Sequence, residues 1–211
     1  MKSISELVIE VCKQGEKMKQ ILMSRKPQEM YNILSGKQKI IILKNVPKDF
    51  TGWVNLICTN GICLYEYEGQ YFLGDGKSNN IISSFPTNLL NRKVICRFWL
   101  DEVDRFSTYQ IEGTTITIDK VIEKSCLTYE ELEEYEDSGD NDPDRPFTLI
   151  GLYALPIKNL EIFAVPKELG EFYKANLWAT SEVIKQMNDK DRKHYQLTKV
   201  PSTWMYVEVG E

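Results

Sequence analysis

The sequence predicts an α+β fold with a mixed, barrel-like sheet and helices between its strands. Three observations lead to this fold class. Short apolar runs rich in β-branched residues recur along the 211 residues and indicate about seven or eight strands. Helical stretches separate them, but few strand–helix–strand units follow one another, which argues against a parallel sheet. The composition, 42% hydrophobic and 27% charged, is that of a folded globular protein.

Residues 1–17 are expected to form an added N-terminal helix. Between Ile4 and Cys12 the apolar residues recur on one helical face, and Gly15 can end the helix. This face is expected to be buried on the domain, on a partner, or in a dimer formed through residues 4–12. The domain itself is predicted to span 18–211.

Local signals predict the elements up to residue 106. They are a strand at 18–24, a helix from Pro27 to Gly36, a buried strand at 39–44, a hairpin over 52–69, a loop at 70–80 and one long strand at 93–106. The hairpin depends on Asn60-Gly61, which lies between two apolar runs and is the strongest short signal of a β-hairpin.

The second half of the chain alternates helices and strands. Thr128 and Glu131 form a capping box that predicts a helix at 128–137. The other predicted elements are a helical turn within 114–126, strands at 148–157 and 159–165, the second ended by Pro166, helices at 167–176 and 177–191, and a strand at 202–209. A helical insertion is therefore expected at 174–197.

Charge is unevenly distributed along the chain. The segment 130–144 carries nine acidic residues and no basic one, so the rest of the chain is mildly basic although the net charge is −5. This segment is either a solvated helix end, a cover for the chain's own lysines, or a surface for a basic partner protein. The residues predicted to bind such a partner are Glu133, Glu134, Glu136, Asp137, Asp140 and Asp142.

Several kinds of site are disfavoured by the sequence. No zinc site or Ser-His-Asp triad is expected, because the chain has a single histidine, His194, and its five cysteines lack zinc-ligand spacing. A P-loop would need glycine where Tyr71 stands before the Gly-Asp-Gly-Lys-Ser stretch. No cofactor, membrane span or secretion signal is expected, and the odd number of cysteines indicates reduced thiols in the cytoplasm.

A basic patch with a nearby aromatic side chain predicts contacts to RNA or a nucleotide, although lysines also occur on any solvated surface. Cations can bind phosphates while an aromatic ring stacks on a base. The predicted nucleic-acid-binding residues are Lys26, Lys39, Lys44, Arg97 and Trp53.

The order of four segments resembles the ASCH domain of the PUA-like superfamily, in the longer form typical of phages and prophages. These segments are ILMSRKPQEMYNILSGKQKIIILKNVP, SCLTYEELEEY, GLYALPIKNLEIFAVPKELGEFY and KVPSTWMYVEV, and the resemblance covers roughly residues 18–207. It implies a small mixed β-barrel flanked by helices, with a cleft proposed to bind RNA or modified nucleosides. It also implies two possible activities, since some members are amidohydrolases acting on acetylated cytidine and ribonuclease activity has been proposed for others.

The chain departs from this family at the positions that carry its chemistry. The family lysine falls on Gln38, the catalytic threonine or glutamate on Ile41, and the arginine on Leu43, while a Trp-His pair is replaced by Leu155-Pro156. Glutamine, isoleucine and leucine can neither activate a nucleophile nor clamp an anion. The resemblance therefore implies a non-catalytic module that recognises RNA or a nucleotide in a repurposed cleft.

Two other hypotheses stay open at this point. In the first, a phage-encoded interaction protein binds and inhibits a host defence protein through the acidic segment or the added helices. In the second, an amidohydrolase or nuclease acts through rearranged residues.

Overall fold

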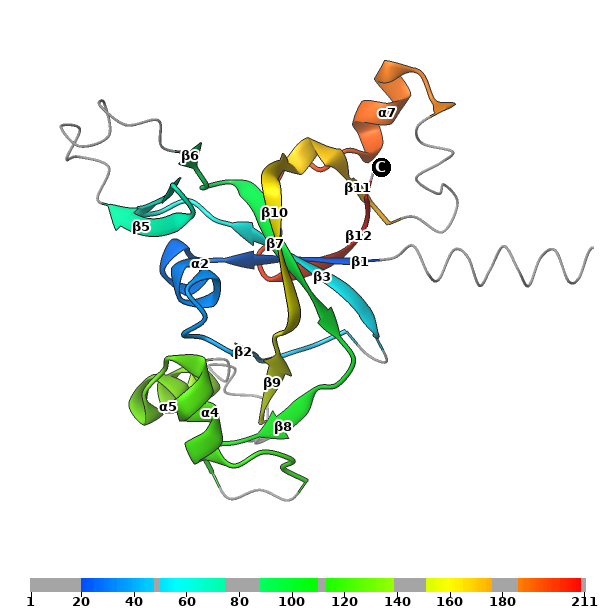
Figure 1. Ribbon diagram of the computed structural model, residues 1–211. Helices are drawn as coiled ribbons and strands as arrows, with labels where there is room; N and C mark the ends of the chain where they lie inside the picture. The colour runs from blue at the N-terminus through cyan, green and yellow to red at the C-terminus, as the bar shows by residue number, and fades with distance from the viewer. Residues whose placement is uncertain are drawn as a thin grey trace, which may run out of the picture. The chain divides into compact units, whose positions relative to one another are not determined.

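The computed structural model describes residues 20–47, 50–74, 88–109, 113–138, 151–175 and 186–209 (Figure 1). Its strands form one six-stranded and two three-stranded sheets with helices beside them, which confirms the α+β class, and the described strands close no barrel. The chain divides into two compact units that are described separately. Unit 1 comprises 1–30, 52–98 and 160–211, and unit 2 comprises 31–51 and 99–159. The helix predicted within 1–17 lies outside the described residues.

The largest sheet is mixed. Its strands in spatial order are β10 (Lys158–Glu168), β7 (Lys93–Leu100), β3 (Gly52–Cys58), β1 (Gln20–Arg25), β12 (Trp204–Val209) and β11 (Phe172–Lys174). β1 runs parallel to β3, with Ile21 opposite Val54, and antiparallel to β12, with Gln20 opposite Val207. The strands predicted at 18–24 and 202–209 are confirmed. Buried side chains from Leu22, Ile57, Val94, Phe172, Leu197 and Val207 form the core of this region.

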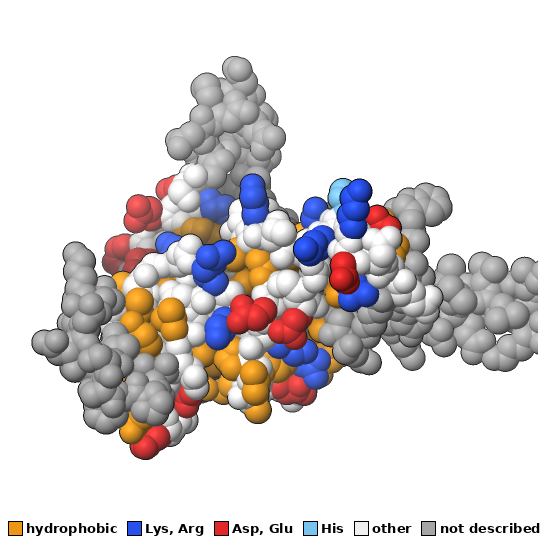
Figure 2. Space-filling view, turned by 90° about the horizontal axis from the view of Figure 1, so that it is seen from above, with side chains coloured by type: hydrophobic (Ala, Val, Ile, Leu, Met, Phe, Trp, Pro, Cys, Tyr) orange, Lys and Arg blue, Asp and Glu red, His pale blue; other side chains and the backbone are white. Residues whose placement is uncertain are grey.

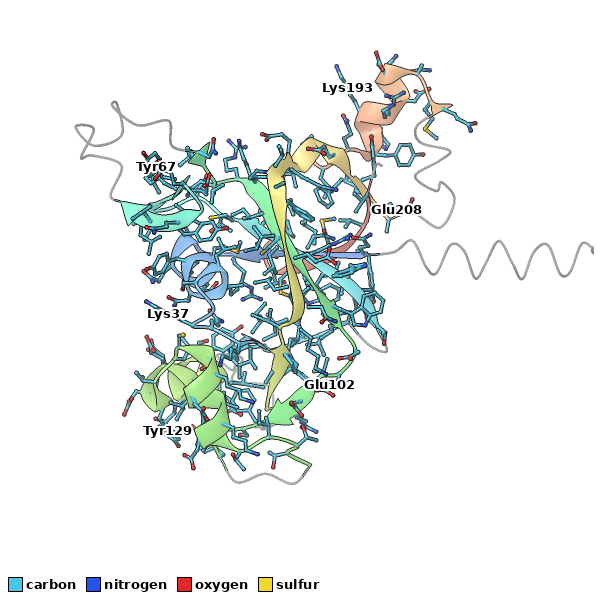
Figure 3. All side chains as sticks on the ribbon, viewed as in Figure 1. Lys37, Tyr67, Glu102, Tyr129, Lys193 and Glu208 are labelled. Carbon is cyan, nitrogen blue, oxygen red and sulfur yellow. The ribbon has the colours of Figure 1, made fainter. Side chains whose placement is uncertain are left out.

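The hairpin predicted across Asn60-Gly61 is wrong. β3 stays in the six-stranded sheet, while β4 (Cys63–Tyr67) pairs with β5 (Gln70–Gly74) and β6 (Asn88–Leu89) in a separate sheet. The hairpin turn lies instead between Tyr67, labelled in Figure 3, and Gln70. Its central residues, Glu68 and Gly69, have φ of 50° and 77°, the left-handed conformation that suits a two-residue hairpin turn. β5 also occupies the first part of the loop predicted at 70–80.

Tertiary contacts explain why the chain leaves the sheet after β3. The Asn91 side-chain amide donates to the carbonyls of Thr59 and Ile62, at 3.1 and 3.0 Å, and Thr59 N–H donates to Arg25 O at 2.8 Å. These bonds satisfy the backbone of the connection. The signal of Asn-Gly is local, whereas all three contacts come from residues distant in sequence.

The prediction of one long strand at 93–106 is wrong, because the structure has two strands there. β7 ends at Leu100, and β8 (Asp104–Phe106) joins a three-stranded sheet with β9 (Leu152–Pro156) and β2 (Ile40–Leu43). Between them, Asp101 and Glu102, the second of which is labelled in Figure 3, both lie 3.0 Å from Lys158 Nζ. Alternation of apolar residues indicates a strand but does not show where the chain changes sheets.

Pro166 does not end its strand, and the helix predicted at 167–176 is wrong. β10 continues through Pro166 to Glu168, followed by a 3₁₀ turn at Leu169–Glu171 and by β11. β10 is the first strand of its sheet, and proline is tolerated in an edge strand because no neighbour there needs its missing N–H. In the turn, Glu168 N–H donates to the Glu171 carboxylate at 2.7 Å.

Unit 2 packs two helices on its three-stranded sheet (Figure 1). The helices are α4 (Ile118–Ser125) and α5 (Tyr129–Asp137), and the capping box of Thr128 and Glu131 is present as predicted. The buried core consists of Ile40, Ile42, Phe106, Val121, Leu132, Leu152 and Ala154. The strand predicted at 39–44 is confirmed as β2.

Helix α2 (Pro27–Leu34) begins and ends where the sequence predicts. Pro27 is its first residue, and Gly36 follows its last turn with φ of 72°. Gly36 N–H donates to Ile33 O at 3.0 Å, so a helix-terminal carbonyl is satisfied.

The helix expected at 177–191 is only partly testable, because 176–185 lie outside the described residues. Helix α7 (Asp189–Tyr195) begins later, where the Asn188 side chain accepts from Asp191 N–H at 3.0 Å. Met187 and Tyr195 pack against Tyr173 of β11. None of the described helices combines the length and apolar character that a membrane crossing requires.

Candidate nucleic-acid interface

Two of the predicted nucleic-acid-binding residues, Arg97 and Trp53, lie beside each other on neighbouring strands of unit 1. Arg97 of β7 places its guanidinium carbon 4.1 Å from the ring centre of Trp53 on β3. The same group lies 5.9 Å from the ring of Phe163 on β10, and its Nε donates to the Glu161 carboxylate at 2.7 Å. Lys167 Nζ lies 5.1 Å from the Phe163 ring. We call these five residues the Arg97 cluster.

The Arg97 cluster combines exposed charge with aromatic rings. The Arg97 side chain is 30% exposed and that of Glu161 is 48% exposed, so their ion pair is accessible to water. A guanidinium has five N–H donors, and the ion pair uses the one on Nε, so a phosphate can be bound without breaking it. Phe163 and Lys167 were missed in the sequence, because nothing local indicates that β10 lies beside β7.

A groove of about 230 Å³ opens beside the Arg97 cluster and shares Phe163 with it. Strands of both unit 1 sheets form its walls. Apolar side chains from β7 and β10 line one part, and polar side chains from β4, β5 and β6 line another. The lining residues that matter here are Glu66, Tyr71, Asn88, Ile95, Ile162 and Phe163.

Two hydrogen bonds hold the Glu66 carboxylate at this groove. Asn88 Nδ2 donates to one oxygen at 2.9 Å, and Gly69 N–H donates to the other at 2.8 Å. Both bonds favour the charged form, so they lower the pKa of Glu66. Burial, followed by the nearby Glu66 charge, raises the pKa of Tyr71. At neutral pH the groove therefore contains an ionised carboxylate and a protonated phenol.

The other predicted cations are distributed over both units. Lys26 is exposed at the start of α2 in unit 1, and Lys39 is exposed in unit 2. Lys44, also in unit 2, lies 5.1 Å from the Tyr135 ring and donates to Ser138 Oγ at 3.0 Å and Glu136 O at 3.4 Å. Lys44 thus binds the C-terminal end of α5, where a cation complements the helix dipole.

Two carboxylates of the acidic segment are used inside unit 2. The Glu136 carboxylate accepts from Ser107 Oγ at 2.6 Å and from Thr108 N–H and Oγ1 at 2.7 and 2.6 Å. The Asp137 carboxylate accepts from Tyr109 Oη at 3.0 Å. These bonds tie α5 to the chain that follows β8.

The other four carboxylates predicted to bind a partner lie either on α5 or outside the described residues. Glu134 is exposed on α5 and Glu133 is half-buried. Asp140 and Asp142 lie outside the described residues. Of the predicted carboxylates on α5, Glu134 and Asp137 are exposed, whereas Glu133 and Glu136 are half-buried.

The positions that the sequence resemblance aligns with reactive residues are buried at Gln38, Ile41 and Leu43. The buried Gln38 side chain donates to Ile40 O at 2.9 Å. Ile41 and Leu43 are buried in β2, and Ile41 pairs with Leu155 across the β2–β9 ladder. The apolar side chains at these positions pack within the protein.

The His, Cys, Asp and Glu residues of the described ranges form no metal site. No group of three or more His, Cys, Asp or Glu residues there is arranged to hold a metal ion. Cys58, Cys63, Cys96 and Cys126 are free thiols, and burial raises the pKa of Cys58 and Cys96 to about 12.

His194 is exposed on α7. Figure 2 shows Lys and Arg side chains around this histidine. Acidic side chains alternate with them along the helix, and Arg192 lies 4.0 Å from Asp189. This mixture of charges is typical of a solvated surface.

Comparison with known proteins gives similarity in structure only. No protein family and no curated protein matches the sequence. The crystal structure of the ASCH protein from Zymomonas mobilis is similar with a TM-score of 0.49 at 10% identity, covering 90% of this chain and 87% of that one. Two mutant forms of that protein are also similar at 10% identity. One mutant form has a TM-score of 0.46 and covers 89% of this chain and 88% of its own. The other mutant form has a TM-score of 0.47 and covers 90% of this chain and 89% of its own.

Proposed function

We propose that the protein is a non-catalytic binding module that recognises single-stranded RNA or a nucleotide through the Arg97 cluster. The observation that carries this proposal is the stack of Arg97 on Trp53, beside Phe163 and Lys167. Proteins that bind single strands combine cations for the phosphates with aromatic rings on which bases stack. The sequence resemblance to long phage and prophage ASCH proteins supports a role in the cytoplasm of a host cell.

The surface of unit 1 supports this proposal better than the lysines of unit 2. Lys44 already donates to the end of α5, so binding a phosphate there would break contacts that hold its own helix. The ion pair of Arg97 with Glu161 uses only the donor on Nε, so a phosphate can bind the remaining guanidinium donors while the pair stays intact. Lys26 adds an exposed cation within the same unit.

The absence of turnover is the second part of the proposal. It is supported by the burial of Ile41 and Leu43 and by the internal hydrogen bond of Gln38. We therefore expect the purified protein to leave acetylated cytidine intact. Deacetylation that disappears in a Lys39→Ala variant would contradict this and favour an enzyme.

Fluorescence anisotropy with a labelled single-stranded RNA tests binding. We expect log K to fall linearly with log salt concentration, because phosphate contacts release counterions. Arg97→Ala should weaken binding about tenfold and reduce the slope by about 1. Lys120→Ala, which removes an exposed charge from α4 in unit 2, is the matched control and should change neither value.

The alternative function, inhibition of a host protein, is distinguished by capture from host lysate with and without nuclease. A captured protein that resists nuclease and is lost when Glu133 and Glu134 are both changed to Gln would favour the alternative. These two positions are chosen because the carboxylate of Glu136 holds unit 2 together. Loss of the captured material on nuclease treatment favours the RNA-binding module.

A further inference from the structure

We propose that the groove beside Phe163 binds a guanine base, whose Watson–Crick edge is read by the Glu66 carboxylate. This inference rests on the proposed RNA-binding function and names the base that the site selects. It uses a different part of unit 1 from the Arg97 cluster, and the two parts share one residue, Phe163.

The size and walls of the groove suit one planar ring system. Its volume of about 230 Å³ is below the roughly 300–1,000 Å³ of pockets that take drug-sized ligands. Ile95, Ile162 and Phe163 provide apolar walls, and Ile162 is 45% exposed, so a base covering it would remove apolar surface from water.

The fixed carboxylate determines which base fits. A carboxylate offers about four acceptor positions, and Asn88 and Gly69 each occupy one on a different oxygen of Glu66. One acceptor position is thus left on each oxygen, and a ligand with two adjacent donors could use both. Guanine presents such a pair, N1–H and the 2-amino group, on one edge. Adenine and cytosine present an amino group next to an acceptor, and uracil presents one N–H between two carbonyls.

The two bonds to Glu66 also prepare the site before the base arrives. They hold the carboxylate in one orientation, and they lower its pKa, which further favours the ionised form. Charge-assisted, bidentate hydrogen bonds are stronger and more selective than single neutral ones. A base that offers an acceptor instead of a donor would face the negative charge directly.

The Arg97 cluster supplies the phosphate contacts for the same nucleotide. Arg97 and Lys167 lie 5.9 and 5.1 Å from the ring of Phe163, which also lines the groove. A base packed against Phe163 therefore has cations next to it for its backbone. The base contact determines selectivity, and the cations provide affinity that does not depend on sequence.

Anisotropy with three labelled RNAs tests this inference on the unmodified protein. An oligouridine with one central guanosine should bind roughly tenfold more tightly than oligouridine alone. Replacing that guanosine by inosine, which lacks the 2-amino group, should remove part of the gain. GMP should displace the RNA more effectively than AMP, CMP or UMP.

Glu66→Gln tests the role assigned to the carboxylate. This variant should lose the preference for guanosine and bind oligouridine as the unmodified protein does. Glu68→Gln is the matched control, because it removes the same charge two residues away without lining the groove, and it should keep the preference. Thermal unfolding of both variants checks that the β4–β5 hairpin is intact.

The outcomes separate the two proposals. Salt-dependent binding of all RNAs with equal affinity, or a preference for another base, overturns the guanine site and leaves the RNA-binding module standing. A guanosine preference that remains in Glu66→Gln also overturns the proposal that the Glu66 carboxylate reads the base. No binding of any RNA or nucleotide overturns the module itself.

Discussion

The Arg97 cluster and the Lys44 contact both place a cation over an aromatic ring, but the two cations differ in their other partners. Lys44 lies 5.1 Å from Tyr135 and donates to the end of α5, so its charge stabilises its own fold. Arg97 lies 4.1 Å from Trp53, and the ion pair it forms is with a partly exposed carboxylate. A cation beside an aromatic ring is therefore a candidate ligand contact only where its donors are not already satisfying the backbone.

The carboxylates of the two regions differ in the same way. Glu136 accepts three short bonds from the chain after β8, and these hold α5 in place. Glu66 accepts two bonds that orient it at a groove. The first arrangement uses a carboxylate for stability, and the second leaves one acceptor position on each oxygen of a carboxylate that lines a groove.

The largest effect is expected in the unit 2 core. Leu132 is the buried side chain of α5, so Leu132→Ala should lower the free energy of unfolding by about 2–5 kcal/mol. Urea denaturation measures this. A loss below about 1 kcal/mol would mean that polar contacts, rather than the core, hold α5.

Glu136→Ala is expected to have the next largest effect. It leaves three donors of Ser107 and Thr108 without their acceptor, at a cost of about 1–3 kcal/mol in unfolding free energy. Glu134→Ala, on the exposed face of the same helix, should cost under about 0.5 kcal/mol. Urea denaturation measures both losses. Equal losses in the two variants would mean that the hydrogen bonds of Glu136 contribute no more to stability than an exposed carboxylate does.

The comparison between Arg97 and Lys44 can be tested directly with two alanine variants. Arg97→Ala should weaken RNA binding about tenfold and leave stability nearly unchanged, because the exposed ion pair contributes at most about 1 kcal/mol. Lys44→Ala should lower the melting temperature and leave RNA affinity unchanged. If Lys44→Ala weakens RNA binding as much as Arg97→Ala, the interface extends to unit 2.

A smaller effect is expected at the capping box. Thr128 Oγ1 accepts from Glu131 N–H at 3.2 Å, so Thr128→Ala should lower the free energy of unfolding by about 1 kcal/mol. Thermal unfolding monitored by circular dichroism measures this loss. Thr128→Ser keeps the hydroxyl and should restore most of it.

Thiol reactivity should distinguish exposed from buried cysteines without changing stability. Cys126 is exposed, whereas burial raises the pKa of Cys58 and Cys96 to about 12. Since the thiolate is the reactive form, Cys58 and Cys96 should resist alkylation at pH 8 until the protein unfolds. Peptide mapping by mass spectrometry identifies the labelled residues, and rapid labelling of Cys96 in the folded protein would contradict its burial in β7.

Elements specified by short-range signals could be predicted from the sequence. Helix α2 begins at Pro27 and is closed by Gly36, α5 begins at the capping box of Thr128, and the apolar run of β2 is buried. Each of these elements depends on residues that are close together in the sequence. Local backbone preference and capping therefore suffice to determine them.

Strand pairing and the candidate site were decided by tertiary structure. Asn60-Gly61 has the stronger hairpin signal, but the turn forms at Glu68-Gly69, because distant contacts from Asn91 and Arg25 hold the first connection outside a hairpin. Trp53 and Arg97 belong to one predicted set, but only the sheet order shows that they are neighbours and places Phe163 beside them. Such pairings depend on which distant strands bury their faces against each other, and local preference carries little information about that choice.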